Sequence, residues 1–245
     1  MDKSLYLAMS GAKQTLLSQG VHANNLANAS TTGFKADFAQ ARSMQVFGET
    51  HPSRVYALTE NPGTRFDQGP MQSTGRELDV AVSGKGWIAI QTPDGGEAYT
   101  REGALKITPT GLLTTGSGHP VLGNGGPIVL PPAQKIEVGV DGSISVVALG
   151  EEPSAIAEID RIKLVNPDSA SLYKSKDGLI RMKEGEAEPD AGVRVISGFL
   201  EESNVNPVES MTEILSLARK FEIQLKVMKA AEEADRSAAQ LLRIT

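Results

Sequence analysis

The distribution of glycine and proline constrains this chain more than any other sequence feature. Residues 208–245 contain neither residue type, whereas nearly all of the 25 glycines and 13 prolines lie between Gly33 and Pro207. Both residues interrupt regular structure, so a long segment without them is typical of a helix, and a segment dense in them is typical of short strands and turns. The chain is therefore predicted to have a helix at each end and a β-rich middle.

The predicted C-terminal helix has a well-defined start. Asn206 suits the N-cap, Pro207 suits the first helical position, and Glu209 follows at the third, from which its carboxylate can reach back to the cap. Apolar residues then recur with a heptad-like spacing, which Glu232 and Asp235 interrupt: Met211, Ile214, Ala218, Phe221, Leu225, Met228, Ala239 and Leu242. Such a helix is about 50 Å long, more than one small domain covers, so part of its apolar face requires a partner.

The N-terminal segment is predicted to form a second amphipathic helix that ends near Asn28. Its apolar seam, with Gln19 as the polar exception, consists of Leu5, Met9, Ala12, Leu16, Ala23 and Leu26. Gly11 and Gly20 each lower the helix propensity by about 1 kcal/mol relative to alanine, so this helix needs packing to be stable. Two arrangements remain open. The two helices pack on each other within one monomer, or their small alanines allow several helices to pack in an assembly.

The middle of the chain is predicted to consist of short strands. Residues 35–46 suit either a helix or a strand, and residues 48–63 are expected to form a loop. Strands are predicted at 78–82, 87–91, 136–140, 143–146, 159–165 and 193–200. The dipeptide Asp141-Gly142 predicts a hairpin with a type I′ turn. This spacing favours an irregular β-sandwich or barrel-like fold over βαβ units.

Composition and motifs argue against most kinds of chemistry. The formal net charge of −6 makes a phosphate-binding surface unfavourable, and no nucleic-acid partner is expected. There is no cysteine, and the three histidines are far apart in sequence, so no metal or other cofactor is predicted. A glycosidase would need two facing acids, for which Glu77, Asp79, Glu97 and Glu102 are candidates, but carboxylates at strand ends are usually surface groups.

Two features bear on localisation. No apolar stretch approaches the roughly 18 residues of a membrane span, so no membrane insertion is expected. The N-terminus lacks the basic and apolar regions of a signal peptide. If the protein leaves the cytoplasm, we expect export without a cleaved signal.

Three sequence blocks together resemble the rod, hook and rod-associated proteins of the bacterial flagellar axial family. They are ANNLAN at 23–28 followed by TGFK at 32–35, TGRELDVAVSGKGW at 74–87 continuing into YTREG at 99–103, and GFLEESNVNPV at 198–208. Their order and spacing agree with the family over nearly the whole chain. The chain length and the Gly86-Trp87 pair are more similar to the F-type proximal-rod proteins than to the longer distal-rod proteins.

The resemblance implies an α+β fold in which discontinuous N- and C-terminal helices form one coiled-coil-like domain that flanks an all-β central domain. The boundaries expected are 1–34 and 207–245 for the helical domain, 35–65 for a linker, and 66–206 for the β domain. It also implies a structural, non-enzymatic subunit of the basal-body rod in the periplasm. The subunits would assemble through their terminal helices into a helical tube that transmits torque.

The resemblance further implies the partners and the contact residues. The expected partners are other proximal and distal rod proteins, copies of the same chain, and the flagellar export apparatus. The residues expected at subunit interfaces are Leu5, Met9, Leu16, Asn24, Asn25, Leu26, Asn28, Phe34, Asn204, Asn206, Met211, Ile214, Phe221, Leu225, Met228 and Leu242. The alternatives are a distal-rod or other axial protein, a periplasmic β-domain enzyme with helical arms, and a coiled-coil adaptor with an inserted β domain.

Overall fold

The chain divides into two compact units, which we describe separately. The computed structural model describes residues 3–39, 41–45, 55–59, 63–150 and 156–243. The helical unit comprises Met1–Asn28, Ala36–Arg65 and Val205–Thr245, and the β unit comprises Ala29–Lys35 and Phe66–Asn204. The protein is thus of the α+β class, with a helix on either side of a mostly β middle in the sequence.

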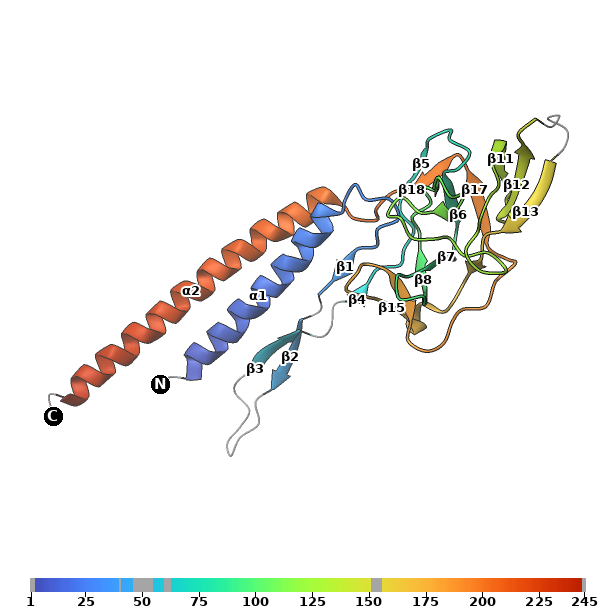
Figure 1. The fold of residues 1–245 in the computed structure, drawn as a ribbon. Helices are drawn as coiled ribbons and strands as arrows, with labels where there is room; N and C mark the ends of the chain where they lie inside the picture. The colour runs from blue at the N-terminus through green and yellow to red at the C-terminus, as the bar shows by residue number, and fades with distance from the viewer. Residues whose placement is uncertain (1–2, 40, 46–54, 60–62, 151–155, 244–245) are drawn as a thin grey trace. The chain divides into compact units, whose positions relative to one another are not determined.

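Two long helices dominate the helical unit. Helix α1 (Lys3–Ala27) and helix α2 (Pro207–Arg243) lie side by side (Figure 1). Both helices were predicted, and so was the start of α2, where Oδ1 of Asn206 accepts hydrogen bonds from the backbone N–H groups of Val208 (3.1 Å) and Glu209 (3.3 Å). None of the described helices is long and apolar enough to span a membrane.

The helical unit also contains two small strand pairs. Strand β1 (Asp37–Phe38) pairs with β4 (Gly63–Thr64), and β2 (Ala41–Gln45) pairs with β3 (Val55–Thr59), which packs against α1. Of the helix and strand alternatives for 35–46, the strand is therefore correct. The prediction of a loop over 48–63 is wrong for β3, because β-branched and aromatic residues there complete an antiparallel ladder. The rest of that stretch, 48–54 and 60–62, lies outside the described residues.

The β unit is built from several small antiparallel sheets. The largest has the strand order β14-β7-β8-β16-β15, and a three-stranded sheet has the order β11-β12-β13. The remaining strands form the pairs β17–β6, β18–β5 and β10–β9. The bounds are Met71–Ser73 (β5), Val80–Ser83 (β6), Trp87–Gln91 (β7), Glu97–Thr100 (β8), Lys106–Ile107 (β9), Leu113–Thr114 (β10), Ala133–Val138 (β11), Ser143–Ala148 (β12), Ile156–Arg161 (β13), Leu164–Val165 (β14), Leu172–Lys174 (β15), Ile180–Met182 (β16), Arg194–Ser197 (β17) and Phe199–Glu201 (β18).

Two apolar clusters form the core of the β unit. The larger gathers aliphatic side chains of β6, β7 and β12, among them Val80, Ile88 and Ile144, and the smaller surrounds Trp87 and Tyr99. Strands β6, β7 and β12 correspond to predicted strands, whereas β8, which carries Tyr99, was not predicted. The core of the unit rests on ordinary burial of apolar side chains.

The hairpin between β11 and β12 differs in one detail from its prediction. The N–H of Gly139 donates to the carbonyl of Ser143 (2.8 Å), and the N–H of Gly142 donates to the carbonyl of Gly139 (3.0 Å). Gly142 has a φ of 83°, whereas no described residue other than glycine has a positive φ. A type I′ turn needs positive φ at both central residues. The type I′ prediction is therefore wrong. The loop is a type I turn closed by a glycine bulge, which spares Asp141 the left-handed conformation.

Candidate subunit interface

One face of α2 packs on α1. Ser210 and Leu217 are buried, and Gln224 lies on the same face, two turns beyond Leu217. The hydroxyl of Thr15 donates to Oε1 of Gln224 (3.1 Å), and a Cβ added at Gly11 would lie 2.9 Å from Nε2 of the same side chain. The glycine therefore allows α1 to approach a polar side chain of α2 closely, and the two helices share a mixed apolar and polar contact.

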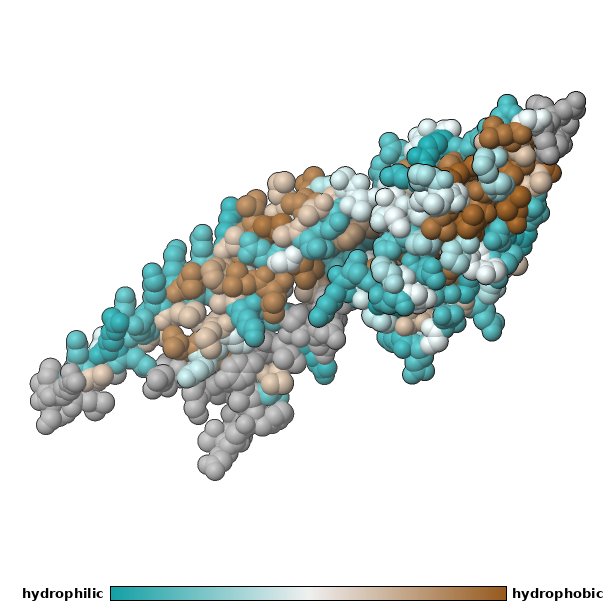
Figure 2. Space-filling view, viewed as in Figure 1, coloured by the Kyte–Doolittle hydropathy of each residue, from teal (hydrophilic) through white to brown (hydrophobic). Residues whose placement is uncertain are grey.

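Each helix exposes a second, apolar face. On α1 it consists of Tyr6, Met9 and Leu16, and on α2 of Val208, Met211 and Leu215, with 46–71% of each residue exposed. Three- and four-residue spacings, or their sums, place each set along one side of its helix. Figure 2 shows the apolar surface that runs over these helices. We call these six residues the exposed helix faces; contiguous exposed apolar surface of this kind marks an interaction site.

The residues predicted at the interface divide between these two environments. Met9, Leu16, Met211 and Leu225 are exposed, whereas half-buried side chains occur at Leu5, Leu26, Ile214, Phe221 and Met228. On α2, Ile214, Phe221 and Met228 lie on the covered side, whereas Met211 and Leu225 each follow a residue of the face marked by Ser210, Leu217 and Gln224, about 100° further around the helix. The side chain of Leu242 lies outside the described residues.

The asparagines predicted at the interface make contacts within their own chain. The buried Asn25 donates from Nδ2 to the carbonyl of Asp37 (2.6 Å) and accepts from the N–H of Asp37 (2.9 Å), so it holds β1 against the end of α1. Asn28 donates from Nδ2 to the carbonyl of Asn24 (2.9 Å) and thereby caps the helix. Nδ2 of Asn204 donates to the carbonyl of Asp67 (3.0 Å). Asn206 caps α2, as described above.

The most buried charges of the β unit lie where the chain enters and leaves that unit. The carboxylate of Glu201 binds Nζ of Lys35 (2.5 Å) and Nη1 of Arg101 (2.8 Å), and all three side chains are at most 3% exposed. Trp87 covers both cations, with its ring centroid 5.2 Å from the guanidinium and 6.0 Å from the ammonium. We call Lys35, Trp87, Arg101 and Glu201 the junction cluster.

Further hydrogen bonds reach the junction cluster, although Nε of Arg101 is buried without a partner among the described residues. Nζ of Lys35 also donates to the carbonyl of Asp67 (2.7 Å), and Glu201 Oε1 accepts the N–H of Gly69 (3.0 Å). Burial lowers the pKa of Lys35, and the hydrogen bond and charge of Glu201 oppose that shift. A buried ion network of this kind is costly to break from one side, because the remaining charge is left unpaired.

The junction cluster was not predicted from the sequence, although the sequence contains a signal for it. Each of the three sequence blocks that carry the family resemblance contributes to it: Lys35 the first, Trp87 and Arg101 the second, and Glu201 the third. The blocks are far apart in sequence, so their meeting required the fold. Phe34, predicted at a subunit interface, has Nζ of Lys174 at 3.8 Å from its ring centroid.

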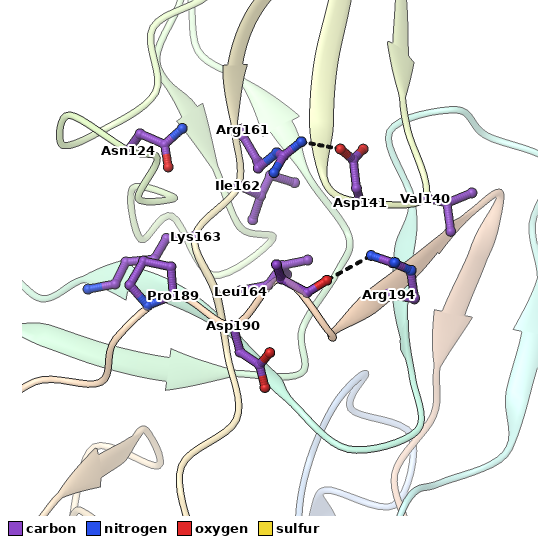
Figure 3. Close-up of a pocket in the computed structure, with 11 residues that line it drawn as sticks. Asn124, Val140, Asp141, Arg161, Ile162, Lys163, Leu164, Pro189, Asp190 and Arg194 are labelled. Carbon is purple, nitrogen blue, oxygen red and sulfur yellow. Dashed lines mark hydrogen bonds and ion pairs between the residues drawn. The ribbon is translucent and has the colours of Figure 1, made fainter.

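The β unit also contains an open cavity of about 520 Å³ (Figure 3). Arg161 and Asp141, which form an ion pair, point toward each other at its wall, and Lys163 binds Glu97 (2.6 Å). Hydrogen bonds from Ser143 hold the pKa of Asp141 below its usual value. The guanidinium of Arg194 donates to a backbone carbonyl. These charged groups are engaged within the unit, and we assign no ligand to the cavity.

The four carboxylates considered as possible catalytic acids each have a different partner. Asp79 lies 3.4 Å from Nε of Arg76, Glu97 binds Lys163, Glu102 accepts a hydrogen bond from Ser117, and Glu77 lies 3.9 Å from Nζ of Lys135. Each of these carboxylates is therefore engaged by another side chain of the β unit.

Paired helices with exposed apolar faces, joined to a β unit, define a structural subunit suited to assembly.

Three family models match the chain and agree with this class of protein. Residues 5–35 match the flagella basal body rod protein model, 81–146 the D1 domain of flagellar hook protein FlgE/F/G, and 196–241 the C-terminal model of flagellar basal body rod FlgEFG proteins. The chain is 42% identical to the flagellar basal-body rod protein FlgF of Salmonella typhimurium and 41% identical to that of Escherichia coli, each over 100% of both chains. It is 32% identical to FlgG of Bacillus subtilis, over 95% of this chain and 96% of the relative.

The chain therefore belongs to the family of flagellar basal-body rod proteins, and it is more similar to these FlgF relatives than to that FlgG. It is a structural subunit of the flagellar basal body, as the resemblance implied. Membership of this family implies interaction with other rod and hook proteins.

Proposed function

We propose that this chain is a subunit of the proximal rod that assembles through α1 and α2 into a helical tube and transmits torque. Its partners are copies of itself and the adjoining proximal and distal rod proteins, and the flagellar export apparatus delivers it. It performs no catalysis. The terminal segments 1–34 and 207–245 form a coiled-coil-like rod core, 35–65 connects, and 66–206 forms the β domain.

The observation that carries this proposal is the pair of exposed helix faces. Apolar surface yields about 25 cal/mol for each Å² removed from water, so six large side chains at half exposure represent several kcal/mol that the isolated chain does not gain. A neighbouring subunit that covers these faces would bury this apolar surface, and the assembly would gain that free energy. A contact between two different faces generates a helix of subunits, whereas a contact between identical faces closes a dimer.

Of the sequence-predicted set, Met9, Leu16, Met211 and Leu225 are exposed, and we expect these residues to contact a neighbour. Leu225 is 40% exposed and lies beside the α1 contact, so it is available to a neighbour without being essential to the α1–α2 pair. Leu225→Asp would place a carboxylate in a dry interface at a cost of several kcal/mol. We expect cells with this variant to export the protein but to lack assembled rods.

The matched control introduces the same charge elsewhere. Val129 of the β unit is 58% exposed, and Val129→Asp adds an equal charge at an exposed apolar position of that unit. Electron microscopy of isolated basal bodies, together with immunoblots of exported protein, distinguishes the two. Rods of normal length in the Leu225→Asp strain, or loss of rods in both strains, would contradict assembly through the helices.

A further inference from the structure

The polypeptide passes between the two units four times. The crossings follow Asn28, Lys35, Arg65 and Asn204, as the division of the chain requires. Within the β unit, the segments beside these crossings are Ala29–Lys35, the stretch that begins at Phe66, and the stretch that ends at Asn204. Any force that one unit exerts on the other through the chain must enter the β unit through these segments.

These three segments are bound to one another inside the β unit. The N–H of Gly33 donates to the carbonyl of Glu201 (2.8 Å), and the N–H of Asn204 donates to the carbonyl of Phe34 (3.3 Å). The N–H of Glu202 donates to the carbonyl of Pro70 (2.8 Å). The first and last segments are therefore joined side by side, and the last is joined to the middle one.

The junction cluster adds a side-chain connection to each segment. Lys35 belongs to the first segment, Gly69 belongs to the second, and Glu201, which binds both, begins the third. The same carboxylate binds Arg101, which directly follows β8 of the five-stranded sheet. Nη2 of Arg101 donates to the carbonyl of Gly84 (2.7 Å), so Arg101 also reaches the loop after β6. One buried carboxylate thus ties the connecting segments to the central strands.

We propose that Glu201 and its partners Lys35 and Arg101 form the mechanical clamp through which load passes from the connecting segments into the β unit. Apolar contacts are non-directional and allow sliding, whereas charge-assisted hydrogen bonds depend strongly on distance and angle and resist shear. An apolar cluster of equal volume would be at least as stable, so stability alone does not account for three buried charges here. The inference rests on the proposed torque-transmitting function of the subunit.

The test uses the full-length chain with Lys35→Met, which releases the first segment and leaves the Arg101–Glu201 pair in place. Amide hydrogen exchange should become at least 10-fold faster at Gly33 and Asn204, while the core amides of Ala89 and Leu113 keep their protection. In cells, rods should still assemble, and rotation should slow disproportionately as the viscosity of the medium rises.

The matched control is Val146→Ala, which weakens the core of the same unit and leaves the cluster intact. It should not produce a viscosity-dependent defect. The clamp would be overturned by unchanged exchange at Gly33 and Asn204 in Lys35→Met, or by an equal dependence on viscosity in the control. Failure of the proposed function would be seen separately, as normal rods in the Leu225→Asp strain.

A second variant covers the case in which Lys35→Met does not fold. Arg101→Lys keeps the charge and removes the fork that reaches both Glu201 and Gly84, and it should give a smaller change of the same kind. If either variant releases core and junction amides together, the cluster is a general part of the core, and the proposal is wrong.

Discussion

Gly33 and Gly75 share one backbone conformation but differ in the space around them. Both have a φ of 70°, a conformation that costs a residue with a side chain about 1–2 kcal/mol. A Cβ at Gly75 would meet nothing within 4 Å, whereas a Cβ at Gly33 would lie 2.3 Å from the carbonyl carbon of Arg101 and 2.4 Å from the backbone nitrogen of Glu102. Gly33→Ala must therefore move backbone, and Gly75→Ala need not.

The expected difference follows from these contacts. Gly75→Ala should destabilise the β unit by about 1–2 kcal/mol, which is the conformational cost alone. Gly33→Ala adds an overpacking cost of about 1–3 kcal/mol and weakens the hydrogen bond from the Gly33 N–H to Glu201, which contributes about 1 kcal/mol. We expect its total cost to be about 3–6 kcal/mol.

Trp87 is the only tryptophan of the chain, and it lies in the junction cluster, so its fluorescence follows unfolding of the β unit. Urea unfolding of both variants, followed at Trp87, gives the two midpoints. At equal slopes, the midpoint of Gly33→Ala should fall well below that of Gly75→Ala. Equal midpoints would show that the segment 29–35 does not pack on Arg101 as the structure has it.

Three further changes test other parts of the structure. A Cβ added at Gly20 of α1 would meet nothing within 4 Å. Gly20→Ala should therefore stabilise the helical unit by about 0.5–1 kcal/mol, measured by thermal unfolding with circular dichroism. A lower melting temperature would contradict the open environment. Asn206→Ala should cost about 1 kcal/mol and Asn206→Asp little, and equal melting curves would exclude the cap. Burial raises the pKa of Tyr99 to about 12, above the unfolded value of about 10. The free energy of unfolding of the β unit should therefore fall by roughly 2–3 kcal/mol as the pH rises from 10 to 12. Tyr99→Phe should abolish that loss, and a pH dependence that persists in the variant would contradict it.

Local patterns explain why much of the fold was predictable. The signals for the helices are local: the absence of glycine and proline, a cap at Asn206 and the apolar spacing. Both helices were therefore predicted close to their observed bounds. A short apolar run between glycine-rich turns predicted the strand Trp87–Gln91 for the same reason. The predictions failed where the outcome depends on contacts distant in sequence. Strand β3 exists because β2 is beside it, and the β11–β12 turn has its shape because of the register of the two strands.

Short motifs and helical periodicity sufficed to predict the class of protein, the terminal helices and the family, because they are local properties of the sequence. The choice of which side of each helix is covered depends on packing in the folded chain. That choice placed Leu217 against α1 and left Met211 and Leu215 exposed, because one turn of helix offers several apolar faces and packing selects among them. The tertiary structure likewise brought Lys35, Arg101 and Glu201 together. No local pattern could indicate that meeting, since a buried charge is tolerated only where the fold supplies its counter-charge.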